Sequence, residues 1–374
     1  LLCHRTGLPR YDSLWLFTSP ERSEILEKLR HLKPNAGFRE VFQYNNLMYV
    51  VLSLLVERVS GERFEDFVER RLFEPLEMQH SSLSIEGLCA SNDHSFPYAA
   101  QDGETKRIPY RDLGAATAAG GINASIEDMA RWVLLNLHGG ETPDGRRVIS
   151  RNSMLETHTP HCVISDLFSI ACAQSYAYGQ GWYISQYRGH HMLGHAGNID
   201  GFSAEVCLLP MENIGVVVTT NTLNMLTHVV SRSILDCLLS ETPVHWNAHF
   251  TGIFTDINSG KLCPSSKHDR RSGRVEGTRT TLPMELFAGS FEHPAFGTIE
   301  IECAEEGLRG KLFGIPCSFK HYHFDTFTLL DTLLAGTKIR FHHDGNGGVE
   351  HLTISLEPGA EDCVFTRQDA DPGR

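Results

Sequence analysis

The hydrophobic pattern of the chain changes near residue 258, and the change predicts two domains of different class. Before residue 258, apolar residues alternate between helical and strand spacing, with helical spacing over 64–72 and strand patterns over 203–209 and 214–220. After it, short runs of alternating polarity are separated by turn signals, at 297–302, 307–313, 325–330, 337–343, 349–355 and 362–367. Such a series is typical of a small antiparallel barrel or sandwich.

A polar and basic stretch separates the two patterns. Residues 258–281, NSGKLCPSSKHDRRSGRVEGTRTT, contain almost no apolar side chains, which is typical of a flexible linker. A chain of 374 residues is long enough for two domains. We therefore expect a first domain over 1–250, a linker over 251–283 and a barrel over 284–370.

Charge and cysteine usage narrow the classes of partner. The net charge of −13 opposes binding to nucleic acid and to anionic membrane surfaces. The longest apolar run, 47–56, is too short to cross a bilayer, which needs about 20 residues. The ten cysteines include no CxxC pair and are too dilute for a disulfide scaffold, so free thiols and a cytoplasmic location are favoured.

Tyr44 and Asn46 stand directly before the apolar run 47–56, where a buried helix is expected. A phenol at this place can exchange a proton with a nucleophile, and the amide beside it can position a substrate. The structural alternative is that Asn46 caps the helix and Tyr44 packs against it.

A second candidate stretch is MLGHAGNIDGFSAEVCLLP, residues 192–210. His195, Ala196 and Gly197 end a predicted edge strand, where small residues would let a substrate backbone lie against the strand. The amide of Asn198 can then face an acyl oxygen and help to stabilise an oxyanion. The structural alternative is a glycine-rich strand end with a surface histidine.

Two other patterns carry less chemistry. Residues 113–132 combine small side chains with a capping box at Ser125–Asp128, and Gly120-Gly121 lacks the flanking pattern of a phosphate-binding loop. The histidine pairs at 190–191, 321–323 and 342–343 have no HExxH motif and no cysteine at a useful spacing. We therefore expect structural or surface histidines, no metal site and no cofactor.

Taken in order, several segments resemble the serine β-lactamase/penicillin-binding protein superfamily, in particular its class C β-lactamase-related branch. The similar segments are LLCHRTGLP (1–9), YNNLMYVVLSLLVERVSG (44–61), EPLEM (74–78), AAGGINA (118–124), YGQGW (178–182) and GHAGN (194–198). The stretch ELFAGSFEHPAFGTIEIE (285–302) resembles the lipocalin-like C-terminal domain of some members. The resemblance implies an α/β fold in which helices flank an antiparallel sheet, followed by a small antiparallel, lipocalin-like β-barrel.

The same resemblance implies acyl transfer through the serine of a Ser-x-x-Lys motif, whose lysine accepts the serine proton. None of the eight lysines has a serine three residues before it, and Cys317-Ser-Phe-Lys320 is the nearest imitation. In the family this motif lies a few dozen residues before the segment that resembles residues 1–9. The expectation is therefore an N-terminally truncated copy that is inactive as given.

Residue roles follow from the resemblance position by position. Tyr44 would deprotonate the nucleophile and protonate the leaving group, and Asn46 would hold the substrate amide or the lysine. His195 would bind a substrate carboxylate or polarise the Tyr–Ser network. Gly197 would leave room for the substrate, and the backbone N–H of Asn198 would form half of an oxyanion hole. His195 stands where many relatives have lysine, which favours an esterase or peptidase over antibiotic hydrolysis.

The predicted function is a serine hydrolase that forms an acyl-enzyme with a small ester, amide or D-amino-acid peptide. One alternative is an acyltransferase or transesterase that acts on a small metabolite. Another is a non-catalytic ligand-binding pseudoenzyme that keeps a ligand cleft around Tyr44 and His195. In a further alternative the barrel itself binds the ligand, since a small barrel can hold one small molecule. The expected partner is thus a small molecule, and a homo-oligomer remains an option.

Overall fold

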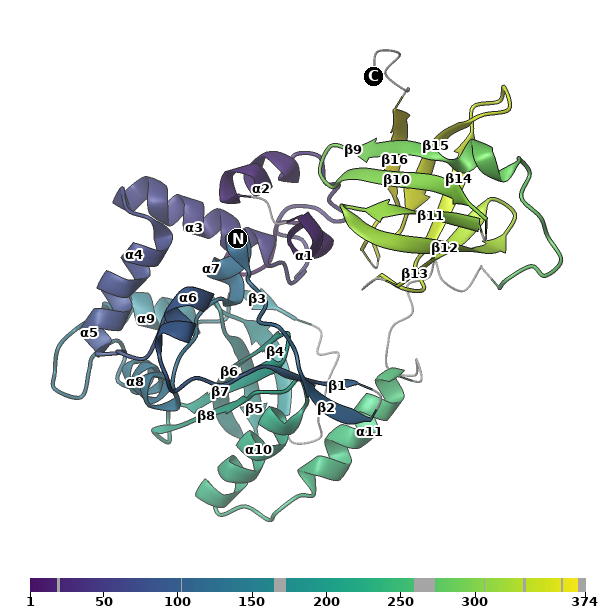
Figure 1. Cartoon of the computed structure of the whole chain (residues 1–374). Coiled ribbons are helices and arrows are strands. Elements are labelled where there is room, and N and C mark those ends of the chain that lie inside the picture. The colour runs from purple at the N-terminus through teal and green to yellow at the C-terminus, as the bar shows by residue number, and fades with distance from the viewer. Residues whose placement is uncertain are drawn as a thin grey trace. The chain divides into compact units, whose positions relative to one another are not determined.

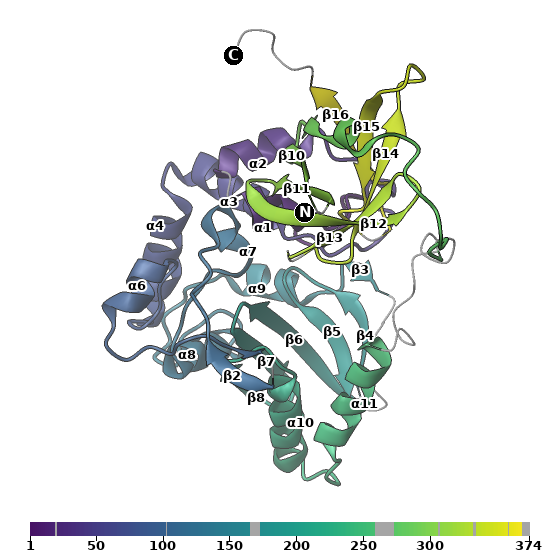
Figure 2. The ribbon, with the colours of Figure 1, turned by 45° about the vertical axis from the view of Figure 1, so that its right-hand side comes forward.

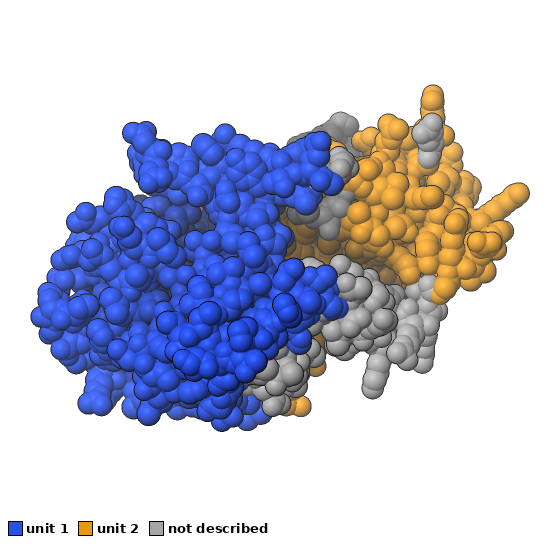
Figure 3. Space-filling model, turned by 90° about the horizontal axis from the view of Figure 1, so that it is seen from below, with its two compact units in different colours: residues 1–5, 48–264 blue, residues 6–47, 265–374 orange. Residues whose placement is uncertain are grey.

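The computed structural model describes residues 1–18, 21–101, 103–164, 173–258, 273–305, 307–331, 334–357 and 359–368. The chain forms two compact units, each assembled from segments that are distant in sequence (Figure 3). Unit 1 comprises residues 1–5 and 48–264, and unit 2 comprises residues 6–47 and 265–374. This division differs from the expected first domain over 1–250, because residues 6–47 pack with the barrel.

A six-stranded antiparallel sheet organises unit 1 (Figures 1 and 2). Its strands lie side by side in chain order: β3 (Cys162–Val163), β4 (Ala173–Tyr178), β5 (Tyr183–Tyr187), β6 (His190–Ile199), β7 (Phe202–Leu209) and β8 (Ile214–Thr220). Arg188 and Gly189 join β5 to β6 with φ values of 50° and 87°. These left-handed conformations are those of a type I′ turn, whose twist matches that of paired strands.

Helices cover both faces of this sheet, which confirms the predicted α/β fold. α8 (Ile126–Leu137) places Val133 in a buried cluster with Ile184, Leu193 and Leu208. α10 (Leu226–Leu238) and α11 (Trp246–Asn258) pack against the opposite face of the sheet. The buried cluster on that face includes Met192, Cys207, Val216, Leu235 and Trp246.

The remaining elements of unit 1 connect these layers. They precede the sheet in the chain: α3 (Leu47–Ser60), α4 (Phe64–Val68), the π-helix Glu69–Phe73, α5 (Glu74–Leu76), α6 (Ile85–Ala90), the hairpin β1 (Tyr98–Gln101) and β2 (Glu104–Arg107), the 3₁₀ turn Gly114–Ala116, α7 (Thr117–Gly120) and α9 (Arg151–His158). The predicted cap is present, because Ser125 Oγ accepts a hydrogen bond of 3.1 Å from the Asp128 N–H at the start of α8.

Unit 2 contains a closed antiparallel barrel of eight strands, which confirms the predicted C-terminal barrel. The strands follow one another up and down, and the last pairs with the first: β9 (Gly289–His293), β10 (Gly297–Ala304), β11 (Gly307–Leu312), β12 (Ile315–His323), β13 (Thr326–Leu330), β14 (Lys338–His343), β15 (Val349–Ile354) and β16 (Cys363–Gln368). Fully buried side chains, among them Phe287, Phe291, Phe327, Leu352 and Phe365, form its core. The interior considered above as a ligand cavity is thus occupied by side chains.

Residues before α3 are tied to this barrel. They form α1 (Ser13–Thr18) and α2 (Arg22–Leu29). The Tyr11 N–H donates a hydrogen bond of 2.8 Å to Glu357 Oε2, and Asn35 Nδ2 donates one of 3.0 Å to Gly359 O. The Tyr11 ring lies 6.2 Å from that of Phe296.

The structure also differs from the expected linker over 251–283 at both ends. α11 continues to Asn258, because Trp246 and Phe250 are buried in the core of unit 1 and hold the helix there. Near the other end, the Thr281 N–H and Oγ1 donate hydrogen bonds of 2.8 and 2.6 Å to the carboxylate of Asp325. Residues 259–272 lie outside the described residues. Among the described residues, no helix is long and apolar enough to span a bilayer.

Candidate functional site

The five residues predicted for the site fall into two groups, one in each unit. Tyr44 and Asn46 belong to unit 2, together with residues before α3. His195, Gly197 and Asn198 belong to unit 1 and share strand β6. Each group is described within its own unit.

Asn46 and Tyr44 meet the same ion pair. The Asn46 Nδ2 group donates a hydrogen bond of 3.0 Å to Asp12 Oδ1, which also accepts one of 2.8 Å from Trp15 Nε1. Asp12 forms an ion pair with Arg10, whose guanidinium lies 5.0 Å from the centre of the Tyr44 ring. The sequence analysis did not identify Arg10 and Asp12, which follow the LLCHRTGLP segment.

The neighbouring Asn45 has a structural role. It is fully buried, and its Nδ2 donates hydrogen bonds to the backbone oxygens of Pro9, at 2.6 Å, and of Leu8, at 3.3 Å. The amide thereby fixes the segment that carries Arg10 and Asp12 against the residues before α3. Asn45 therefore holds the polar cluster in place.

Burial determines the protonation state of Tyr44. Desolvation raises the pKa of its phenol above 10, and the nearby Arg10 guanidinium only partly opposes this effect. Tyr44 is therefore a neutral phenol at neutral pH and can donate a proton. For Tyr44 to act as a base, it would first have to lose its proton, and a further cation would be needed to stabilise the resulting phenolate.

His195 is held in one neutral tautomer by two hydrogen bonds. Nδ1 lies 2.8 Å from the backbone oxygen of Ala196, and because a carbonyl only accepts, Nδ1 carries the proton. Nε2 then accepts from the Tyr178 hydroxyl at 3.2 Å. Burial lowers the pKa of the imidazole, which reinforces the neutral form. Of the two roles considered, polarising a hydroxyl suits a neutral imidazole, whereas binding a carboxylate suits the charged one.

An aromatic cluster surrounds this histidine. The Tyr183 ring lies 5.4 Å from that of His195 and 4.9 Å from that of Tyr178. Behind them, the buried His4 ring lies 5.1 Å from Tyr178 and 5.3 Å from Tyr49. Sequence analysis missed these partners, although Tyr178 opens the YGQGW segment and His4 lies in LLCHRTGLP.

The backbone of β6 beyond His195 forms an open sheet edge. β5 pairs with β6 only along residues 190–194, and no described strand covers the same side of residues 195–199. Ile199 and Phe202 close the hairpin to β7, so Asn198 and Ser203 form the next, non-hydrogen-bonded pair. The N–H of Asn198 therefore points away from β7, toward the open edge.

Gly197 leaves this edge unobstructed. A Cβ atom built on Gly197 would have no atom within 4 Å, and both Gly197 and Asn198 are exposed. The open edge thus presents an N–H group beside a bare backbone, three residues from His195. Such an arrangement can accept an extended acyl group and stabilise charge on its oxygen.

The histidine pairs do not converge on a metal-like centre. His190 Nδ1 lies 2.6 Å from Glu212 Oε1, and His343 Nε2 lies 2.8 Å from Asp325 Oδ2. The His342 ring stacks on that of His351 at 4.4 Å. Within the described ranges, no group of three histidine, cysteine, aspartate or glutamate side chains is arranged to hold a metal ion.

Comparison with known proteins relates both units to described families. The Beta-lactamase family model matches residues 1–236, and the model of a domain of unknown function, DUF3471, matches residues 273–367. The unguisins hydrolase ungD of Aspergillus violaceofuscus is 26% identical over 88% of this chain and 63% of its own length. Protein flp of Staphylococcus aureus is 26% identical over 51% of this chain and 34% of its own length. The chain thus spans less than two thirds of these curated relatives.

Solved structures share the fold. The octameric penicillin-binding protein homologue from Pyrococcus abyssi superposes with a TM-score of 0.57 at 18% identity, over 98% of this chain and 77% of that one. A penicillin-binding protein from Bacillus halodurans gives a TM-score of 0.50 at 23% identity, over 63% and 70% of the two chains. Because the family model covers more than half of the residues, and the sheet and helices have the expected arrangement, this chain belongs to the beta-lactamase family.

Proposed function

We propose that this chain serves a serine hydrolase reaction that passes through an acyl-enzyme, with a small ester, amide or D-amino-acid peptide as substrate. The observation that carries the proposal is the open edge of β6, where the Asn198 N–H faces outward beside Gly197. Acyl transfer needs such a donor, because negative charge develops on the carbonyl oxygen when the nucleophile adds. Membership of the beta-lactamase family supports this reading of the edge.

His195 would act as a neutral imidazole in this reaction. Its Nδ1 proton is engaged by Ala196 O, and Tyr178 donates to Nε2. A polarised hydroxyl at Nε2 is suited to support proton movement near a nucleophile, while Gly197 leaves room for the substrate backbone. Tyr178 would act as a positioning residue that fixes the ring of His195.

Tyr44 and Asn46 would supply proton transfer and substrate positioning. Because burial keeps the phenol protonated, Tyr44 is suited to protonate the leaving alcohol or amine. Asn46 is oriented by Asp12 and would hold the substrate amide or the catalytic lysine. The nucleophile would be the serine of a Ser-x-x-Lys motif, which these 374 residues do not contain.

Hydrolysis is favoured over acyl transfer to another acceptor by the relatives. The two Aspergillus proteins similar to most of this chain are named unguisins hydrolases. In hydrolysis, water attacks the acyl-enzyme and releases a carboxylic acid; in the alternative acyltransferase, an alcohol or amine takes the place of water. Product analysis with an added alcohol would separate these two outcomes.

A fluorophosphonate probe, which labels activated serines, tests the proposal directly. It would be applied to this chain and to the chain extended upstream, in frame, to the next methionine codon. We expect only the extended form to be labelled, and we expect Ser→Ala in its Ser-x-x-Lys motif to abolish labelling. Labelling of neither form would contradict the proposal and favour the ligand-binding pseudoenzyme.

A further inference from the structure

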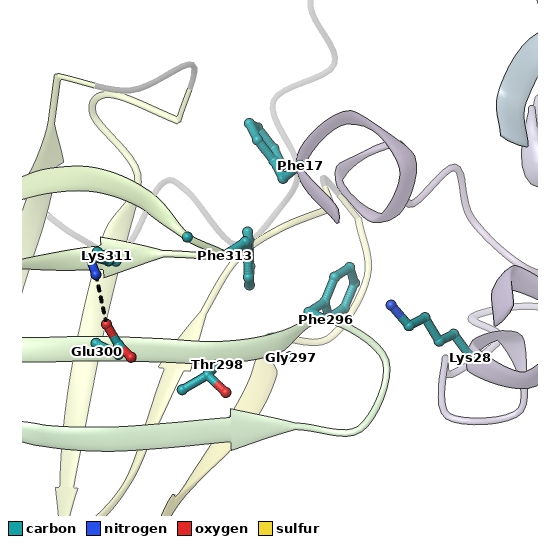
Figure 4. Close-up of a pocket in the computed structure, with 9 residues that line it drawn as sticks. Phe17, Lys28, Phe296, Gly297, Thr298, Glu300, Lys311 and Phe313 are labelled. Carbon is teal, nitrogen blue, oxygen red and sulfur yellow. Dashed lines mark ion pairs between the residues drawn. The ribbon is translucent and has the colours of Figure 1, made fainter. Parts of the chain in front are cut away.

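Unit 2 contains a cavity of about 450 Å³ on the outside of the barrel. Its walls come from α1, from α2, from the residues around the start of β10 and from the β11–β12 turn (Figure 4). The volume lies within the range of small-molecule sites. The cavity is separate from the packed barrel interior.

Three phenylalanine rings form one wall of this cavity. Phe296 is buried, and its ring lies 6.0 Å from that of Phe313 and 6.4 Å from that of Phe365 in the barrel core. The Phe17 ring of α1 lies 6.0 Å from that of Phe313. Because the rings support one another and the core behind them, the apolar wall exists before any ligand arrives.

Phe313 reaches this wall from a strained backbone position. It occupies the first place of the two-residue β11–β12 turn with a φ of 54°, followed by Gly314 at 82°. Type I′ turns strongly favour Asn-Gly or Gly-Gly, because bulky side chains resist the left-handed conformation. The demands of the turn therefore do not account for an aromatic ring at this position.

The charge of the cavity is positive. Lys28 of α2 extends toward Phe296, and no carboxylate of a described residue lies within 4.0 Å of its ammonium group (Figure 4). The other lysine of the lining, Lys311, lies 3.6 Å from the carboxylate of Glu300 and is compensated by it. Among the described residues, the lining thus combines an apolar wall with one cation that no carboxylate compensates.

We propose that this cavity binds a small amphipathic carboxylate. The aromatic or aliphatic part of the ligand packs against Phe17 and Phe313, which the buried ring of Phe296 supports from behind, and its carboxylate accepts charge-assisted hydrogen bonds from Lys28. The proposal is independent of the acyl-transfer chemistry in unit 1. It assigns a binding role to the barrel unit through its outer wall, not through its interior.

Binding of 4-phenylbutyrate to the full chain, measured by isothermal titration calorimetry, tests this proposal, and its neutral amide serves as the charge control. We expect saturable binding of the acid and at least about tenfold weaker binding of the amide. In Lys28→Met, acid and amide should bind with similar, weak affinity. In Phe313→Asn, both should bind at least about tenfold more weakly, while the turn gains a favoured residue and the fold persists.

Two control variants separate the loss of a cavity side chain from the effects of similar substitutions elsewhere on the barrel. Lys320→Met removes an exposed lysine of β12 that does not line the cavity. Phe324→Asn relieves a similar left-handed residue, with a φ of 45°, in the β12–β13 turn. Consecutive hairpins of an up-and-down barrel turn at opposite ends, so this turn lies away from the cavity. Both control variants should bind 4-phenylbutyrate as tightly as the unmodified chain does. The proposal would be overturned if the unmodified chain showed no saturable binding, or if Phe313→Asn and Phe324→Asn lost equal amounts of affinity.

Discussion

At the residue scale, the hydrogen bond between Tyr178 and His195 links the protonation state of the imidazole to the position of its ring. Protonation of Nε2 would turn this acceptor into a donor, and the Tyr178 hydroxyl would then have to turn and accept instead of donate. Burial lowers the pKa of His195 and so keeps Nε2 unprotonated. The histidine is therefore held ready to accept a hydrogen bond at neutral pH.

Replacement of Tyr178 by phenylalanine should lower the pKa of His195 further. The variant removes a hydroxyl that can accept a charge-assisted hydrogen bond from the protonated ring, stronger than the one it donates to the neutral ring, so the pKa should fall by up to about one unit. The measurement is an NMR titration of the His195 ring, assigned through His195→Gln. Tyr110→Phe is the matched control, because the Tyr110 hydroxyl donates to Ser95 O instead. An unchanged or higher pKa in Tyr178→Phe would contradict this interpretation.

Single residues also show where sequence reasoning reaches its limit. The HAGN pattern was sufficient to place His195 and Gly197 on a strand, because small and polar residues interrupt an apolar run there. The partner of His195 was not predictable in the same way. Tyr178 reaches the histidine across the sheet, from a different strand, and such pairing depends on register rather than on local pattern. Asp12 was missed for the same reason, since it meets Asn46 through the tertiary fold.

At the element scale, two glycines of the same sheet have opposite surroundings. Gly215 of β8 faces α8, and a Cβ atom there would lie 2.2 Å from Val133 Cγ1 and 3.3 Å from Leu137 Cδ1. Val133 is buried and β-branched, and such a residue in a helix strongly prefers one rotamer, so its side chain has little freedom to relieve the contact. Gly197 of β6, by contrast, faces open space. The first glycine serves the packing of a helix on the sheet, and the second leaves an edge free.

Alanine substitutions should separate these two roles. Gly215→Ala should reduce the free energy of unfolding by about 1–3 kcal/mol, because α8 must move away from β8. Gly197→Ala, its matched control, should change that free energy by no more than about 0.5 kcal/mol. Urea unfolding followed by circular dichroism measures both. A large loss of stability in Gly197→Ala would show that its edge is packed, contrary to the geometry described.

The elements themselves were predicted with uneven success. Alternating polarity and turn signals were enough for the barrel, because each of its strands carries its own pattern and consecutive strands pair. The boundaries of the two units were harder to predict from the sequence. Residues 6–47 join the barrel through hydrogen bonds such as that from Tyr11 to Glu357, which connect positions 346 residues apart. α11 continues past the expected domain end because Trp246 and Phe250 are buried, a property that composition alone does not reveal.

At the scale of the whole molecule, each unit contains a half-buried histidine with a lowered pKa. In unit 1, burial, together with the charge of His191, lowers the pKa of His158 to about 4. In unit 2, burial, together with the charge of His31, lowers the pKa of His293 to about 4. The two histidines lie in unrelated surroundings, against Trp182 and against Phe296 and Phe365 respectively. Mild acid should therefore weaken both units over the same range of pH.

The sign and range of this effect follow from linkage. An unfolded histidine takes up a proton near pH 6.5, whereas the folded ones do so only near pH 4, so stability is complete above 6.5 and is lost as the pH falls toward 4. We expect the free energy of unfolding to fall by roughly 0.5–1.5 kcal/mol for each histidine across this range, since both side chains are only half-buried and solvent reduces the effect. Urea unfolding of the full chain at pH 7, 6, 5 and 4.5 would measure the loss of stability, and the double variant His158→Gln, His293→Gln should lose less stability over the same range of pH.

The control variant His80→Gln, which replaces an exposed histidine, should lose as much stability as the unmodified chain. If the double variant loses as much stability as the unmodified chain, the destabilisation by acid arises from carboxylates such as Glu205, whose pKa is lowered to about 2, and not from these histidines.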